Sequence, residues 1–158
     1  MDKVNIGLDP SSCQKINTIL GNIIADQYIL YTKTRNYHWN VTGEDFAQYH
    51  KLFEDQYSAI DDDIDEVAER IRALGGKTPA TLGEFLKSAT LKEHPGEFPS
   101  AKTMIENLLA DHETIIRNLR KDIEVCDDLD DVGTEDFLTQ LMEKHEKTAW
   151  MLRATLDI

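Results

Sequence analysis

The sequence has few of the residues that mark disulfide-rich or membrane-spanning proteins. Only two cysteines, Cys13 and Cys126, occur in 158 residues, which is too few for a disulfide framework. No apolar run approaches the roughly 18 to 20 residues that a transmembrane helix needs. The first residues include Asp2, Lys3 and Asp9 but lack the apolar region of a signal peptide. We therefore expect a soluble, cytoplasmic protein with reduced thiols and no membrane partner.

Basic residues are also scarce, since 17 Lys and Arg stand against 30 Asp and Glu, for a formal net charge of −13. Binding to nucleic-acid phosphates needs clustered Lys and Arg, so this balance disfavours a passive nucleic-acid binder. Hydrophobic residues make up 41% of the chain, which is enough to bury a sizeable core and excludes wholesale disorder. The length predicts a single domain over residues 1–158.

Proline is rare and confined to a few places, and apolar residues recur at helical spacing in the long stretches between them. This pattern predicts four long helices: from about Pro10 to Tyr37, from about Asp45 to Leu74, from after Ser100 to the acidic stretch at Asp127, and from near Thr134 onward. Between the second and third, Thr81 and Glu84 form a capping box. A short helix should therefore begin there and end at about Ser88.

The lengths of the connections predict the topology. Short links join the first two and the last two long helices, whereas about 25 residues separate the second from the third. The expected fold is all-α, a four-helix bundle with a long crossover between helices 2 and 3 that contains a short extra helix. This is ferritin-like connectivity, but bundles of one topology serve many functions, so the fold alone does not identify the activity.

The second long helix carries a stripe of histidine and carboxylate side chains. Its members lie within about 100° of one another around the helix: His50, Glu54, Asp61, Asp65 and Glu69. Such side chains are ligands for iron, manganese or zinc, and no cysteine joins them. Because His50 and Asp65 are roughly 22 Å apart along the helix axis, one chain cannot bring both to a single ion.

Spacing alone leaves two interpretations of this stripe open. It is either a solvated charged face, or two copies of the helix pack antiparallel across a two-fold axis. In the second case Asp65 and Glu69 of one chain would face His50 and Glu54 of the other. His38, twelve positions before His50, would lie near the same cluster.

A metal site inside the core of one subunit is disfavoured. The di-iron bundle signature places Glu three residues before His, and none of the five histidines is preceded in this way. His112 and His145 fall on the apolar faces of the last two long helices. We expect them to be hydrogen-bonded core histidines and not metal ligands.

Several segments together resemble the Dps family, the DNA-binding proteins from starved cells, also called miniferritins. They are 36–43 (NYHWNVTG), the following His50 and Glu54, 65–76 (DEVAERIRALGG) and 146–153 (EKTAWMLR). The resemblance extends over the whole chain. It implies a hollow homododecamer of ferritin-like subunits whose ferroxidase centres lie at two-fold interfaces.

Carried over by position, the resemblance implies that His38, His50 and Glu54 come from one subunit and Asp65 and Glu69 from its partner. The family often has Asp where Glu54 stands, but the carboxylate is kept. Trp39 sits beside the centre in the family, where it is suited to intercept radicals. Acidic residues near the last connection line three-fold pores in the family. The matching candidates are Asp131 and Asp136, which would focus cations electrostatically.

The function that the resemblance implies is iron storage and detoxification. Fe(II) would be oxidised to Fe(III), preferentially with hydrogen peroxide, and stored as a ferric mineral in the shell, protecting DNA from oxidative damage. Iron is the implied metal, and other divalent metals such as zinc can occupy the same ligands.

Two alternatives are a nucleoid DNA-binding protein with incidental metal binding and a helical bundle with a merely solvated acidic face. Family members that condense DNA commonly use mobile basic tails. Here residues 1–12 contain a single basic residue, Lys3, and the last two residues are Asp157 and Ile158. A dodecamer would also carry twelve times the net charge of one chain. We therefore expect DNA binding to be weak or absent.

Overall fold

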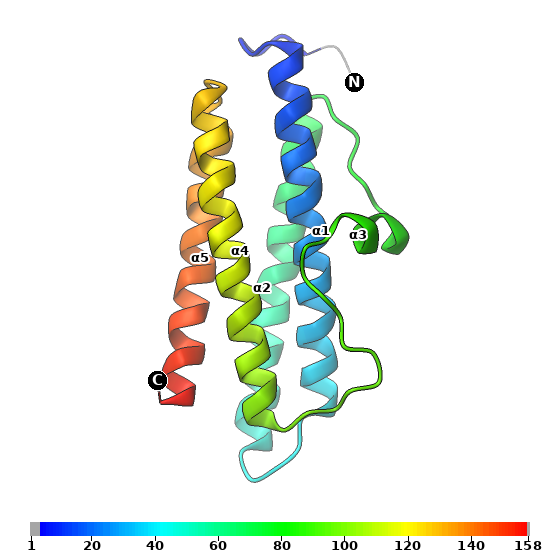
Figure 1. Cartoon of the computed structure of the whole chain (residues 1–158), viewed down its shortest axis with the longest axis vertical. Coiled ribbons are helices and arrows are strands. Elements are labelled where there is room, and N and C mark those ends of the chain that lie inside the picture. Colours follow the sequence, from blue (N-terminus) through cyan, green and yellow to red (C-terminus); the bar gives the residue numbers. More distant parts are fainter. Residues whose placement is uncertain (1–3, 158) are drawn as a thin grey trace.

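The computed structural model describes residues 4–157, which form an all-α fold without strands (Figure 1). The helices are α1 (Pro10–Asn40), α2 (Phe46–Ala73), α3 (Leu82–Ser88), α4 (Ala101–Asp128) and α5 (Val132–Leu156). The four long helices lie side by side in a bundle, and the long crossover from α2 to α4 carries α3 along α1. The predicted bundle, with its short helix in the crossover, is confirmed. Lys3 and Ile158 lie outside the described residues.

Among residues 4–157, no helix combines the length and the hydropathy that a bilayer span requires.

Three of the five helices in residues 4–157, α3, α4 and α5, begin at a residue whose side chain caps the helix. The Thr81 hydroxyl accepts a hydrogen bond from the Glu84 amide at 3.3 Å, and the Glu84 carboxylate accepts one from the Thr81 amide at 3.1 Å. The predicted capping box is therefore confirmed. Ser100 caps α4 in the same way, by accepting from the Thr103 amide at 3.3 Å. Asp9 occupies the N-cap position of α1 but makes no side-chain capping bond.

Two helix boundaries differ from the prediction. The first helix continues past Tyr37 to Asn40, so His38 and Trp39 lie in its last turn. The last helix begins at Val132, two residues before Thr134, because Asp131 is its N-cap. The sequence signal at that point was a run of acidic residues, and acidic side chains are favoured at helix N-termini as well as in solvated loops.

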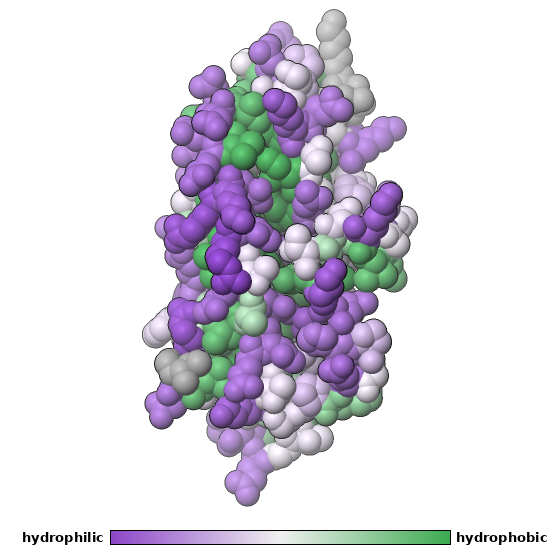
Figure 2. Space-filling view, viewed as in Figure 1, coloured by the Kyte–Doolittle hydropathy of each residue, from purple (hydrophilic) through white to green (hydrophobic). Residues whose placement is uncertain are grey.

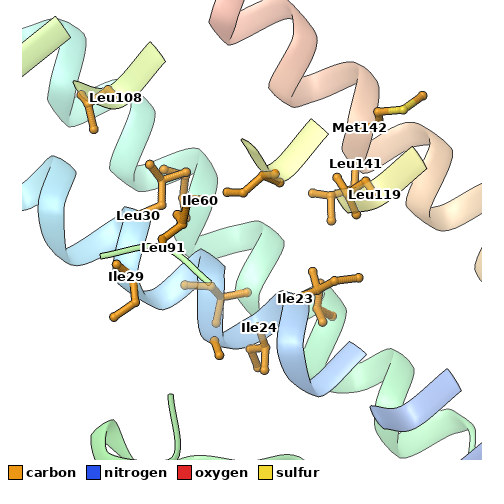
Figure 3. Close-up of a cluster of buried hydrophobic side chains, with 14 of the residues drawn as sticks. Ile23, Ile24, Ile29, Leu30, Ile60, Leu91, Leu108, Leu119, Leu141 and Met142 are labelled. Carbon is orange, nitrogen blue, oxygen red and sulfur yellow. The ribbon is translucent and has the colours of Figure 1, made fainter. Parts of the chain in front are cut away.

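The core follows the inward faces of all four long helices. Figure 3 shows part of it, in which branched aliphatic side chains from the different helices converge. Fully or almost fully buried members include Leu30, Ile60, Leu108, Leu119 and Leu141. The face of the molecule seen in Figure 2 is mostly hydrophilic, with hydrophobic areas between α1 and α4 and over α3, where Leu82 and Leu86 are exposed.

One buried carboxylate anchors the long crossover to the bundle. Asp26 of α1 accepts hydrogen bonds from the backbone amides of Thr90 and Leu91, at 2.6 and 2.9 Å, and from the Thr90 hydroxyl at 2.6 Å. The ring of Tyr28 also stacks on Phe85 of α3, with 4.1 Å between the ring centroids. These contacts hold the crossover against α1 on both sides of the end of α3.

His112 and His145 are hydrogen-bonded core histidines, as predicted, and together they form a hydrogen-bonded chain across the core. Their Nδ1 atoms are 2.8 Å apart, and Nε2 of His145 is 2.8 Å from Nε2 of Gln27 on α1. Burial lowers the pKa of His145 to about 4 and holds the pKa of His112 well below its ordinary value of 6.5. Both imidazoles are therefore neutral at pH 7.

The burial of His112 and His145 predicts a loss of stability in acid. Between pH 6.5 and about 4 the unfolded state binds protons that the buried histidines do not, so the free energy of unfolding falls as the pH falls. The slope is up to about 1.4 kcal/mol per pH unit for each histidine. Urea unfolding at pH 7, 6 and 5 should show a shallower pH dependence for His145→Gln than for the wild type. The exposed control His94→Gln should keep the wild-type slope, and equal slopes in all three proteins would contradict the prediction.

Candidate metal centre

The turn between α1 and α2 brings two histidines face to face. His38 lies in the last turn of α1 and His50 in the second turn of α2. Val41, the first residue of the turn, is buried, and Gly43 adopts a φ of +120°, a conformation that favours glycine. As a result the two imidazole rings stack, with 3.7 Å between their centroids and 21° between their planes.

Two reciprocal hydrogen bonds hold this pair. Nδ1 of His38 is 2.8 Å from the backbone carbonyl of His50, and Nδ1 of His50 is 2.8 Å from the backbone carbonyl of His38. A carbonyl oxygen only accepts hydrogen bonds, so each Nδ1 carries a proton and donates it. In the neutral imidazoles both Nε2 lone pairs are then left available for a metal ion. Ligating histidines are commonly fixed in this way by a carbonyl behind the ring.

Aromatic side chains support the pair from two sides. Phe46 stacks against His50 with 5.0 Å between the ring centroids, and the edge of Tyr57 meets His38 at 5.3 Å. His38 is buried, whereas His50 is half-buried. The rings are therefore held in place before any ligand binds.

The predicted carboxylate ligands lie along α2 at increasing distances from His50. Glu54 is one turn beyond His50 and half-buried, and one of its oxygens is 3.6 Å from Nζ of Lys51. Asp65 and Glu69 are exposed, three and four turns further along the helix. Within residues 4–157, no three His, Cys, Asp or Glu side chains of one chain are grouped to hold a metal ion. One chain thus contributes a histidine pair with a nearby carboxylate, and Asp65 and Glu69 are not brought to it.

Trp39 lies next to the histidine pair, on the outside of the bundle. Its side chain is 63% exposed, and the Arg35 guanidinium carbon lies 5.0 Å from its ring centroid. The same guanidinium lies 5.0 Å from the Tyr57 ring and donates a hydrogen bond to the Tyr31 hydroxyl. Arg35 was not singled out from the sequence. It links Trp39 to the aromatic residues that support His38.

The two acidic residues predicted to line a pore have different surroundings. Asp131 is buried, and it accepts hydrogen bonds from the Thr134 amide at 3.0 Å and from Arg70 Nη2 at 2.9 Å. Its carboxylate therefore caps α5 and ties that helix to α2. Asp136 is exposed and accepts a hydrogen bond from Gln140 at 2.6 Å. The pore role stays a prediction for both residues, and exposure favours Asp136.

Comparison with known proteins identifies the family. Residues 17–158 match the model of a ferritin-like domain. The chain is 46% identical, over 99% of its length and 88% of the relative's, to an uncharacterized low temperature-induced protein of Nostoc sp.. It is 39% identical to DNA protection during starvation protein 2 of Bacillus anthracis, over 91% of this chain and 98% of that protein.

The fold leads to the same family. The crystal structure of the Dps protein from Vibrio cholerae O1 superposes with a TM-score of 0.93 at 32% sequence identity. The superposition covers 99% of this chain and 98% of that one. Sequence and fold agree over nearly the whole length of the chain, which therefore belongs to the Dps family of ferritin-like proteins.

Proposed function

We propose that this protein is an iron-storage ferroxidase that oxidises Fe(II) to Fe(III) at sites shared between two subunits. The observation that carries the proposal is the reciprocal hydrogen bonding of His38 and His50, which leaves both Nε2 atoms available for a metal ion. The Dps protein from Vibrio cholerae O1 is a member of a broad superfamily of ferritin-like diiron-carboxylate proteins. This likeness supports iron as the substrate here.

Each site would combine His38, His50 and Glu54 of one subunit with Asp65 and Glu69 of its partner. When two α2 helices pack antiparallel across a two-fold axis, the two residue numbers of every facing pair have the same average, which marks the axis. The pairs 50/69 and 54/65 meet this requirement, because both have their midpoint between positions 59 and 60. Ser58 lies on the stripe close to this point, and it is small and exposed, which permits close approach of two helices.

The ligand set suits oxidation of ferrous iron by peroxide. Two Fe(II) ions, one hydrogen peroxide molecule and two protons give two Fe(III) ions and two water molecules. Two neighbouring ferrous ions supply both electrons, so the hydroxyl radical that a single ion would release is avoided. Carboxylates such as Glu54 favour the harder Fe(III) product, and a small number of protein ligands leaves positions open for the oxidant. We infer from this a preference for peroxide over dioxygen.

The ferric product would be stored as a mineral inside a dodecameric shell. This assembly would supply the two-fold interfaces that the sites need. Removal of ferrous iron and peroxide together would protect DNA from oxidative damage without contact between the protein and DNA.

Removing one ligand from each half of the site should abolish fast oxidation. We expect the double variant His50→Ala, Asp65→Ala to lose the rapid rise in ferric absorbance when peroxide is added after anaerobic loading with Fe(II). The helical circular dichroism should be unchanged, because both side chains lie outside the core. The wild type should consume about two Fe(II) per peroxide, as the two-electron reduction requires, with little trapped hydroxyl radical.

A matched control is the double variant Asp62→Ala, His94→Ala. It also removes one histidine and one aspartate, both exposed and neither part of the proposed ligand set. Wild-type kinetics are expected for the control. Equal, slow oxidation in the wild type and the ligand variant would mean that the stripe is only a charged face.

Sharing of each site between subunits predicts complementation between two inactive single variants. In a two-fold pair of one His50→Ala and one Asp65→Ala subunit, one site lacks both side chains and the other has all wild-type ligands. Random co-assembly should therefore restore about a quarter of the wild-type sites. The measurement is the amplitude of fast iron oxidation after co-expression, compared with that of each variant alone. No gain over the separate variants would contradict a shared site.

The alternative function, DNA condensation, is disfavoured by the net charge of −13 per chain. Repulsion from phosphate should dominate at physiological salt. We expect no retardation of plasmid in a gel-shift assay at about 0.15 M salt without divalent cations. A parallel lane with added magnesium tests bridging by cations. Retardation in the metal-free lane would show that the charge argument is wrong.

A further inference from the structure

A pocket of about 190 Å³ lies between α2, α4 and α5, and it uses none of the proposed iron ligands. Its lining includes Gln56 and Asp63 from α2, His112 from α4, and Lys144, His145 and Lys147 from α5. The pocket therefore reaches the buried chain in which His145 bonds to both His112 and Gln27.

Two buried polar atoms of this lining have no hydrogen-bond partner among residues 4–157. They are Nε2 of His112 and Oε1 of Gln56. His112 is 2% exposed and Gln56 is 9% exposed. A buried donor or acceptor without a partner is costly, so native proteins normally satisfy such groups with protein or with ordered water.

The hydrogen-bond chain determines what each of these atoms needs. Gln27 presents its amide nitrogen to His145, so Nε2 of His145 accepts and the proton of that ring is on Nδ1. His145 then donates through Nδ1 to Nδ1 of His112, and the proton of neutral His112 is on Nε2. Nε2 of His112 is therefore a donor that needs an acceptor, whereas Oε1 of Gln56 is an acceptor that needs a donor.

Most candidates for the pocket fail this requirement. The ammonium group of Lys147 can only donate, a metal cation cannot accept from an N–H group, and a simple anion cannot donate to a carbonyl oxygen. A neutral molecule with a hydroxyl group both accepts and donates. We propose that the pocket binds small hydroxylic molecules, normally water, and that one of them is held between His112 Nε2 and Gln56 Oε1.

This molecule extends the polar chain to the fourth long helix. Gln27, His145 and His112 belong to α1, α5 and α4, and Gln56 adds α2. The Gln27 amide sets the tautomers of both histidines, and the bound molecule accepts the hydrogen bond that His112 Nε2 then donates. A single string of hydrogen bonds then joins all four helices through the core.

The direct test is a crystal structure of the assembled wild-type protein at pH 7 and atomic resolution, with a second crystal soaked in bromide. We expect one oxygen-sized density peak at about 2.6 to 3.2 Å from both atoms, with no anomalous signal after the soak. A direct bond between His112 and Gln56, Lys147 in the position of the peak, an anomalous bromide peak or no density there would each overturn the proposal.

Two variants of the same pocket separate the proposed contact from general packing. Gln56→Met keeps the length of the side chain but removes the acceptor, and we expect loss of the density peak with a fall in Tm of about 2 to 4 °C. Thr148→Val changes another lining residue without touching either atom, and it should keep both the peak and the Tm. An unchanged peak and Tm in Gln56→Met would contradict the proposal. If that variant does not assemble, the wild-type crystal decides.

Discussion

The imidazoles of His38 and His50 each donate a hydrogen bond to the backbone carbonyl of the other residue, and the geometry of the proposed metal site depends on these two bonds. They close the α1–α2 turn, orient two rings and leave two nitrogen lone pairs free. The His38 carbonyl lies in the last turn of α1, where carbonyl groups lack a partner within the helix, whereas the His50 carbonyl lies near the start of α2. The turn thus combines a structural closure with the two histidines of the proposed metal site.

Apolar periodicity was sufficient to predict the bundle, because every long helix must bury one face. The capping box at Thr81 could also be predicted from the sequence, since its two hydrogen bonds join residues three positions apart. The separation of His50 and Asp65 along one helix also predicted correctly that a single chain does not bring them together. These features depend on distances that a regular helix fixes in advance.

Other features depend on contacts between distant segments, which spacing does not reveal. Asp131 lies in an acidic run that suggested a solvated or pore-lining loop, yet Arg70 and Thr134 bind it in the interior. Gln27 gave no signal in the apolar stripe of α1, although it is fully buried beside His145. The reciprocal bonds of His38 and His50 require the path of the turn as well as the spacing of the residues.

The contacts of Asp26 with the crossover affect how the chain tolerates cleavage. By fixing Thr90 and Leu91 to α1, they divide the crossover into a segment that contains α3 and a second, exposed segment over residues 92–98. A protease that cut this second segment would leave both fragments attached to the bundle by their own contacts, as a nicked but folded subunit.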